Sequence, residues 1–143
     1  MGFKIFLDTN IIIDFFDARR SEHETAVQLF DCAEKNIVAA KTSETALNTT
    51  VYILRKEFRT DAMKAMLNDL LSFLDILPCS NALYRRALLL NANDLEDAVL
   101  YQLALESRLD YFVTSNKKDF KNMVSPLLPV VSAKEMMKLL PAY

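Results

Sequence analysis

The sequence of 143 residues has one glycine, Gly2, one histidine, His23, and no tryptophan. Loops that cradle nucleotide phosphates need glycines where the backbone approaches the phosphate, so a Walker A motif and a dinucleotide fingerprint are excluded. A single histidine excludes zinc sites built from several histidines and makes a Ser-His-Asp hydrolase depend entirely on His23. Carboxylate chemistry remains open, since Asp and Glu number 19 against 17 Lys and Arg.

Charge, cysteine content and hydropathy further limit the class of protein and its cellular location. A net charge of −2 argues against a strongly basic nucleic-acid binder but leaves room for local basic patches. Cys32 and Cys79 lack metal-ligand spacing and are too few for a disulfide framework, which favours reduced thiols. No apolar run reaches the roughly 18 residues of a membrane span. The short apolar start ends at Asp8, unlike a signal peptide, so we expect a cytoplasmic protein with no membrane association.

Short apolar runs alternate with amphipathic helical patterns along the whole chain. Strands are expected at 4–7, 37–40, 75–78, 111–114 and 130–131. Helix starts are expected at Ser21, which opens a capping box, at Thr42 or Ser43, and at Thr60, Ser80, Asp94 and Ser132. The alternation predicts one α/β domain over residues 1–143 with a mostly parallel sheet.

Four acidic residues occupy positions where parallel α/β sheets bind ligands. Asp8 and Asp119 follow predicted strands, while Glu44 and Asp97 lie in the first turns of predicted helices. These ends share one edge of a parallel sheet. Carboxylates that converge there repel one another, and an oxygen-only ligand set suits Mg²⁺ or Mn²⁺. The sequence therefore predicts metal-assisted hydrolysis at this edge.

Each of these acids also has a purely structural interpretation. Asp8 could cap the following helix, Glu44 would be favourable in a first turn without any further role, and Asp119 could be a solvated loop residue. Asp94 is expected first as an N-cap, although its position one turn before Asp97 places two acids on one helix face. The functional interpretation depends on their joint placement.

Polar and basic residues beside the acids are candidates for substrate binding. The hydroxyls of Thr9, Thr114 and Ser115 at the strand ends could position water or phosphate. Basic side chains near the same edge could hold a phosphate backbone: Lys117, Lys118, Lys121, Arg19 and Arg20. For any single one of these cations, a solvated surface charge is the alternative.

Four segments together resemble the PIN-domain nucleases, most closely the small VapC-like proteins of prokaryotes. They are Phe6-Leu7-Asp8-Thr9-Asn10, Thr42-Ser43-Glu44, Asn93-Asp94-Leu95-Glu96-Asp97-Ala98, and Val113-Thr114-Ser115-Asn116 with Asp119-Phe120. The resemblance implies Asp8, Glu44, Asp97 and Asp119 as catalytic metal ligands and Asp94 as an accessory acid. Asn10, which completes the first motif, joins the substrate-binding candidates. Asn116 stands where many relatives carry Asp, so either Asn116 or Asp119 completes the site.

The resemblance also implies a three-layer α/β/α fold with a twisted parallel sheet and Mg²⁺- or Mn²⁺-dependent hydrolysis of RNA. Many such proteins dimerise and are inhibited by an antitoxin protein, which makes a homodimer and an antitoxin candidate partners. One alternative is an inactive PIN-like protein that binds RNA or a protein. Another is a receiver or a haloacid-dehalogenase-like phosphatase. The phosphatase needs a second aspartate where Asn10 stands, and the receiver needs an aspartate at the end of a central strand, where Leu77-Pro78-Cys79 stands, so both are disfavoured.

Overall fold

A computed structural model describes residues 2–141. The strands are β1 (Lys4–Leu7), β2 (Ala39–Ser43), β3 (Leu74–Leu77), β4 (Tyr111–Val113) and β5 (Val130–Val131). The helices are α1 (Thr9–Phe16), α2 (His23–Glu34), α3 (Glu44–Leu54), α4 (Thr60–Leu70), α5 (Asn81–Ala87), α6 (Leu95–Glu106) and α7 (Ala133–Leu139), with a short 3-10 helix η1 (Lys117–Phe120).

The five strands form one sheet in the order β3-β2-β1-β4-β5, and every neighbouring pair is parallel. The predicted α/β class with a mostly parallel sheet is confirmed. From β1 the chain builds outwards through β2 and β3, and then returns to place β4 and β5 on the other side of β1. The strand order therefore reverses between β1 and β4, which is where open parallel sheets bind ligands beyond the strands' carboxyl ends.

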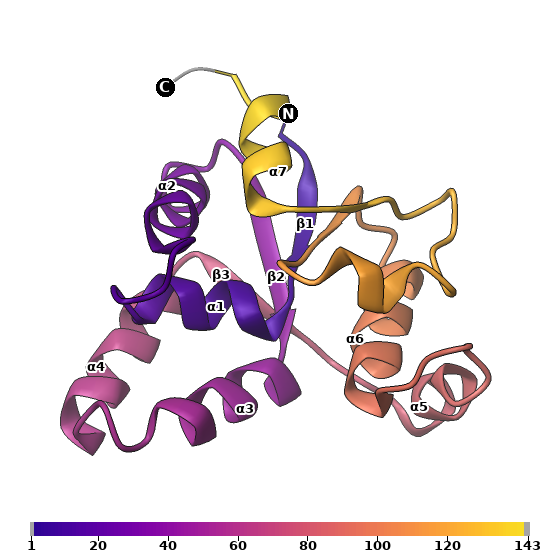
Figure 1. The fold of residues 1–143 in the computed structure, drawn as a ribbon, viewed down its shortest axis with the longest axis horizontal. Helices are drawn as coiled ribbons and strands as arrows, with labels where there is room; N and C mark the ends of the chain where they lie inside the picture. Colours follow the sequence, from indigo (N-terminus) through magenta and orange to yellow (C-terminus); the bar gives the residue numbers. More distant parts are fainter. Residues whose placement is uncertain (1, 142–143) are drawn as a thin grey trace.

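Helices cover both faces of the sheet. Figure 1 shows α2 and α4 on one side and α5 and α6 on the other. The central strand β1 is buried from Ile5 to Leu7, as expected for a strand covered on both faces. Phe6 stacks on Phe112 of the neighbouring β4 with ring centroids 5.2 Å apart, so aromatic packing fixes the two strands that flank the reversal.

Several predicted boundaries differ from the structure. The capping box at Ser21 is wrong, since α2 begins at His23 behind Glu22, and no side-chain hydrogen bond caps this helix. The second strand is Ala39–Ser43 rather than 37–40, because Asn36 takes a left-handed conformation (φ 61°) after α2 and delays the strand. Ser43, Ser80 and Asp94 are confirmed as N-caps, and Ser132 forms the predicted capping box.

The sole glycine has a packing role. A Cβ atom at Gly2 would collide with the backbone carbonyl of Ile37, so the N-terminal segment can run this close to the start of β2 only as glycine. None of the helices within residues 2–141 is long and apolar enough to span a membrane.

Candidate active site

Asp8 follows β1 at the reversal of the strand order and forms the N-cap of α1. Its side chain is buried, with 2% exposed. Three donors hold the carboxylate: the Thr9 backbone N–H lies 2.8 Å from Oδ1, the Thr114 hydroxyl 2.8 Å from Oδ2, and Asn10 Nδ2 3.3 Å from Oδ2. Because Thr114 directly follows β4, the two strands at the reversal fix this carboxylate from both sides.

The N-terminal turn of α6 brings a second group of acids to the same edge. Asp94 caps the helix, as predicted: its Oδ1 accepts the backbone N–H of Glu96 at 2.8 Å and that of Asp97 at 3.3 Å. Asp97 is half-buried and interacts electrostatically with Asp8 across the site. The N-cap therefore fixes the direction of the helix turn that carries Asp97.

Glu96 holds this turn in place, and no role was predicted for it. One oxygen accepts the hydroxyl of Thr9 at 3.0 Å and the other the hydroxyl of Thr49 at 2.8 Å. Glu96 therefore joins the starts of α1 and α6 to the middle of α3. In the sequence, Glu96 stands out only as part of the Asn93–Ala98 motif, because its distant partners on α1 and α3 leave no periodic signal.

Both central carboxylates have raised pKa values. Burial raises the pKa of Asp8 from 3.8 to about 6, although its three hydrogen bonds lower it. The pKa of Asp97 is raised from 3.8 to about 7, first by burial and then by the negative charges of Asp8, Asp94, Asp119 and Glu96. The two carboxylates thus share a region where negative charge accumulates, as is common at catalytic sites.

Of the two other predicted acids, Asp119 interacts with this pair, whereas Glu44 lies apart from it. Asp119 is exposed within η1, and its charge contributes to the raised pKa of Asp97. Glu44 is the exposed first residue of α3, directly after β2, and lines a separate hollow with Cys79 and Leu103. Asn116 is exposed, and its backbone N–H donates to the Thr114 hydroxyl at 3.1 Å.

Several candidates for substrate binding make contacts within the protein. Thr114 is fully buried and orients Asp8, while the Thr9 hydroxyl is used by Glu96. Asn10 bridges the two sides of the site, since its Oδ1 accepts the backbone N–H of Ser115 at 3.0 Å. These contacts position the carboxylates. Two cations are likewise engaged, in ion pairs between Arg19 and Asp17 and between Lys117 and Glu135.

The donor chemistry fits a hard divalent cation. Over residues 2–141, no three His, Cys, Asp or Glu side chains are arranged as a ready-made metal cage. Mg²⁺ rarely uses such a cage, because it keeps several waters and binds through one or two carboxylates together with substrate phosphates. The adjacent oxygen donors of Asp8 and Asp97, each with a raised pKa, fit that mode of binding.

The family model of the PIN domain matches residues 4–118, which run from β1 into η1. The chain belongs to the PIN domain family. The match includes Asp8, Glu44, Asp94 and Asp97 and ends one residue before Asp119. The receiver and haloacid-dehalogenase-like alternatives are thereby excluded.

Proteins similar to this PIN domain include VapC proteins. Ribonuclease VapC1 of Aquifex aeolicus is 32% identical over 139 residues, covering 92% of each chain. The structure of VapBC2 from Rickettsia felis, bound to a DNA fragment from their promoter, superposes with a TM-score of 0.62 at 21% identity, over 90% of this chain and 98% of the other. The structure of VapC20 from Mycobacterium tuberculosis, a Sarcin-Ricin loop cleaving toxin, superposes with a TM-score of 0.67 at 18% identity. The match covers 84% of this chain and 96% of the other. The two structures confirm the PIN-like fold.

Proposed function

We propose that this PIN domain is a divalent-metal-dependent endoribonuclease that acts as the toxin of a toxin–antitoxin pair. The observation that carries the proposal is the coupled pair of Asp8 and Asp97 at the reversal of the strand order. RNA as the substrate class is supported by the 32% identity to a protein named a ribonuclease.

The residues divide into those that hold the cation and those that orient them. Asp8 and Asp97 would bind Mg²⁺ or Mn²⁺, with Glu44 and Asp119 as further ligands and Asp94 as an accessory acid. The bound cation would lower the pKa of a coordinated water and offset negative charge on a phosphate oxygen. Thr114 and Asn10 keep the Asp8 carboxylate in a fixed orientation, and Glu96 holds the α6 turn beside it.

The test is cleavage of labelled single-stranded RNA by the purified chain, with and without Mg²⁺ or Mn²⁺. We expect cleavage that EDTA stops, and Asp97→Asn should lower its rate by roughly 1,000-fold or more, because the variant removes one of two central ligands. Asp61→Asn, an exposed acid in the first turn of α4, is the matched control and should leave the rate unchanged.

Retained cleavage by folded Asp97→Asn protein would contradict the proposal. If the wild-type chain binds no Mn²⁺ at millimolar concentration and cleaves none of several RNAs, the alternative of an inactive PIN-like binding protein is favoured. Cleavage of single-stranded DNA of the same sequence at an equal rate would contradict RNA as the substrate class.

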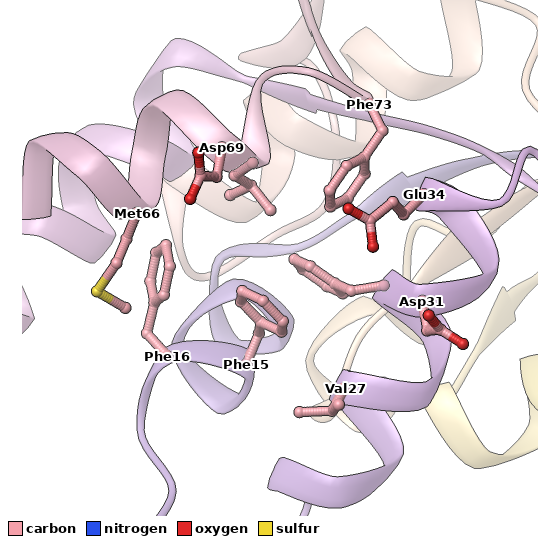
Figure 2. A pocket seen from close by; sticks show the side chains of 10 residues that line it. Phe15, Phe16, Val27, Asp31, Glu34, Met66, Asp69 and Phe73 are labelled. Carbon is pink, nitrogen blue, oxygen red and sulfur yellow. The ribbon is translucent and has the colours of Figure 1, made fainter.

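A groove between α1, α2 and α4 is the proposed docking site of an antitoxin. Figure 2 shows Phe15 and Phe16 side by side on α1, with Met66 and Asp69 of α4 and Phe73 around them. Its volume is about 310 Å³. Phe15 and Phe30, which both line it, stack with their ring centroids 4.2 Å apart. All charged residues lining the groove are acidic: Asp31, Glu34 and Asp69. The groove thus fits a partner segment with apolar anchors flanked by Lys or Arg.

Co-expression with the protein encoded next to this gene tests that docking site. We expect a stable complex that inhibits RNA cleavage, and Val27→Asp should weaken binding by about tenfold or more, since it places a charge where an apolar anchor would bind. Val27 is 39% exposed, so the fold tolerates the change. Leu139→Asp on α7, 46% exposed, is the matched control. Equal binding by both variants would contradict this docking site.

A homodimer and a cytoplasmic location are further parts of the proposal. Exposed apolar side chains on and after α5 support a contact between copies, among them Leu88 and Leu89 at 52% and 85% exposed. Light scattering tests the dimer. The wild-type protein should have the mass of a dimer in solution, and the Leu89→Asp variant should have the mass of a monomer. An unchanged mass would contradict a dimer built on this surface.

A further inference from the structure

A hollow lies beside the candidate active site, at the other end of α1. Its volume is about 410 Å³, within the size range of small-molecule sites. It is lined by Asp14 of α1, by Arg20, Ser21 and Glu22 of the α1–α2 connection, and by Ser115 after β4. A smaller hollow on the other side of Asp14 continues it towards Ser132 and Lys134.

One buried oxygen in this hollow has no partner. Asp14 is 3% exposed, and its Oδ1 accepts Arg20 Nε at 2.5 Å. Its Oδ2 is buried and accepts no hydrogen bond from any described residue. Because a buried charged acceptor without a donor is unfavourable, a donor from outside the chain is expected.

The charges around Asp14 select the kind of ligand. The Arg20 side chain pairs with Asp14 through Nε but is 41% exposed, and the Lys134 ammonium forms no ion pair within residues 2–141, so both can meet an anionic group. A bare anion would meet the carboxylates of Asp14 and Glu22, and a bare cation would meet the two basic groups. A nucleotide satisfies both signs, because it carries a phosphate together with N–H and O–H donors.

The hollow is connected directly to the candidate active site. The backbone N–H of Ser115 donates to Asn10 Oδ1 at 3.0 Å, and Asn10 Nδ2 donates to Asp8 at 3.3 Å. Asp14 follows Asp8 by six residues in the same helix, or about 9 Å along its axis. A nucleic acid strand bound at Asp8 can therefore reach Asp14.

We propose that this hollow is a nucleotide subsite, in which Arg20 contacts a phosphate and Asp14 Oδ2 accepts a hydrogen bond from the base or the 2′-hydroxyl of one nucleotide. The inference takes its ligand class from the proposed function. The ion pair with Asp14 orients the Arg20 guanidinium, whose side chain remains 41% exposed for contact with the phosphate.

Amide chemical shifts of the metal-free protein, titrated with AMP, GMP, CMP and UMP, test the subsite. We expect shifts at Ser21, Glu22 and Ser115 that saturate at millimolar nucleotide. Arg20→Ala should weaken binding by about tenfold by removing the phosphate contact. Lys64→Ala on α4 removes one positive charge elsewhere and should change nothing. Because the titration needs neither metal nor cleavage, its outcome is separate from that of the nuclease assay.

Three further ligands separate the possible contacts. Ribose 5-phosphate lacks the base and deoxynucleotides lack the 2′-hydroxyl, so whichever binds more weakly identifies the donor to Asp14. Sulfate should bind at least about tenfold more weakly than the nucleotides, since it carries negative charge but no N–H or O–H donor at neutral pH. Equal binding of sulfate, or no shift at these amides with any nucleotide, would overturn the proposal.

In the RNA cleavage assay with metal present, Arg20→Ala should raise KM more than it lowers kcat. Arg20→Lys, which keeps the positive charge, should show a smaller rise in KM. A variant that lowers kcat alone, with KM unchanged, would contradict a role in substrate binding.

Discussion

The two ends of α1 each bury an aspartate, and the surroundings of the two carboxylates differ. Asp8, before the first turn, accepts hydrogen bonds from three donors of the protein. Asp14, near the last turn, is paired with Arg20 through one oxygen and leaves the other unmatched. Both are almost fully buried, at 2% and 3% exposed, so burial alone does not distinguish them.

The difference shows what each carboxylate is arranged to accept. The donors around Asp8 are neutral, so they orient its charge without cancelling it, and its acidic neighbours leave a cation as the natural partner. Asp14 already has a cation, so the partner it lacks is a neutral N–H or O–H donor. Burial of a carboxylate therefore predicts a ligand, and the neighbouring groups determine whether that ligand is a metal ion or a hydrogen-bond donor.

The largest expected contrast between the two regions concerns the hydroxyls that follow β4. Thr114→Val removes the donor to Asp8 while keeping the shape of the side chain, and we expect kcat of RNA cleavage to fall by roughly 10- to 100-fold, as for other residues that orient metal ligands. Ser115→Ala changes only a hydroxyl lining the Asp14 hollow and should alter kcat less than about threefold. Equal effects of the two changes on kcat would contradict the assignment of different roles to the Asp8 site and the Asp14 hollow.

A smaller contrast concerns stability without metal. The folded-state pKa of Asp8 is about 6 against 3.8, so between these pH values the folded protein binds more protons than the unfolded chain. Its free energy of unfolding should therefore fall as the pH rises from about 4 to about 6, with Asp97 extending the fall to about pH 7. Asp8→Asn should reduce this fall and stabilise the protein at pH 8 in EDTA by about 1–3 kcal/mol.

Asp14→Asn should act in the opposite direction. It weakens a buried charged contact with Arg20 and should lower the free energy of unfolding by about 1–2 kcal/mol. Urea denaturation at pH 5 and pH 8 measures both variants. Destabilisation by Asp8→Asn at pH 8 would show that its three hydrogen bonds outweigh the cost of burying its charge.

Much of the fold could be predicted because strand patterns and caps are local. The short apolar run at Lys4–Leu7 predicts the first strand, and capping chemistry predicts the N-cap at Asp94; both are confirmed. The expected cap at Ser21 failed because the α1–α2 connection is organised by tertiary contacts, in which Arg20 binds Asp14 and His23 Nδ1 lies 2.8 Å from the Asp14 carbonyl oxygen. Sequence spacing does not encode such contacts.

The candidate site divides in the same way. Asp8 and Asp97 stood out because their positions follow from element boundaries, while the bridging role of Glu96 depends on Thr9 and Thr49, 87 and 47 residues away along the chain. Arg19 and Arg20 were both candidates for holding phosphate, and the structure pairs Arg19 with Asp17 and Arg20 with the buried Asp14 beside the site. Which of two adjacent arginines faces the site is decided by the local path of the backbone.

The most direct test of the central claim is paramagnetic broadening of amide signals by Mn²⁺ in the full chain. The account predicts broadening centred on residues 8–10, 94–97 and 114–116, and its loss in Asp97→Asn protein. The Asp14 hollow should be broadened less, because Arg20 already neutralises that carboxylate. Broadening centred on Asp14 and Glu22, or none at millimolar Mn²⁺, would contradict the assignment of Asp8 and Asp97 as the metal-binding pair.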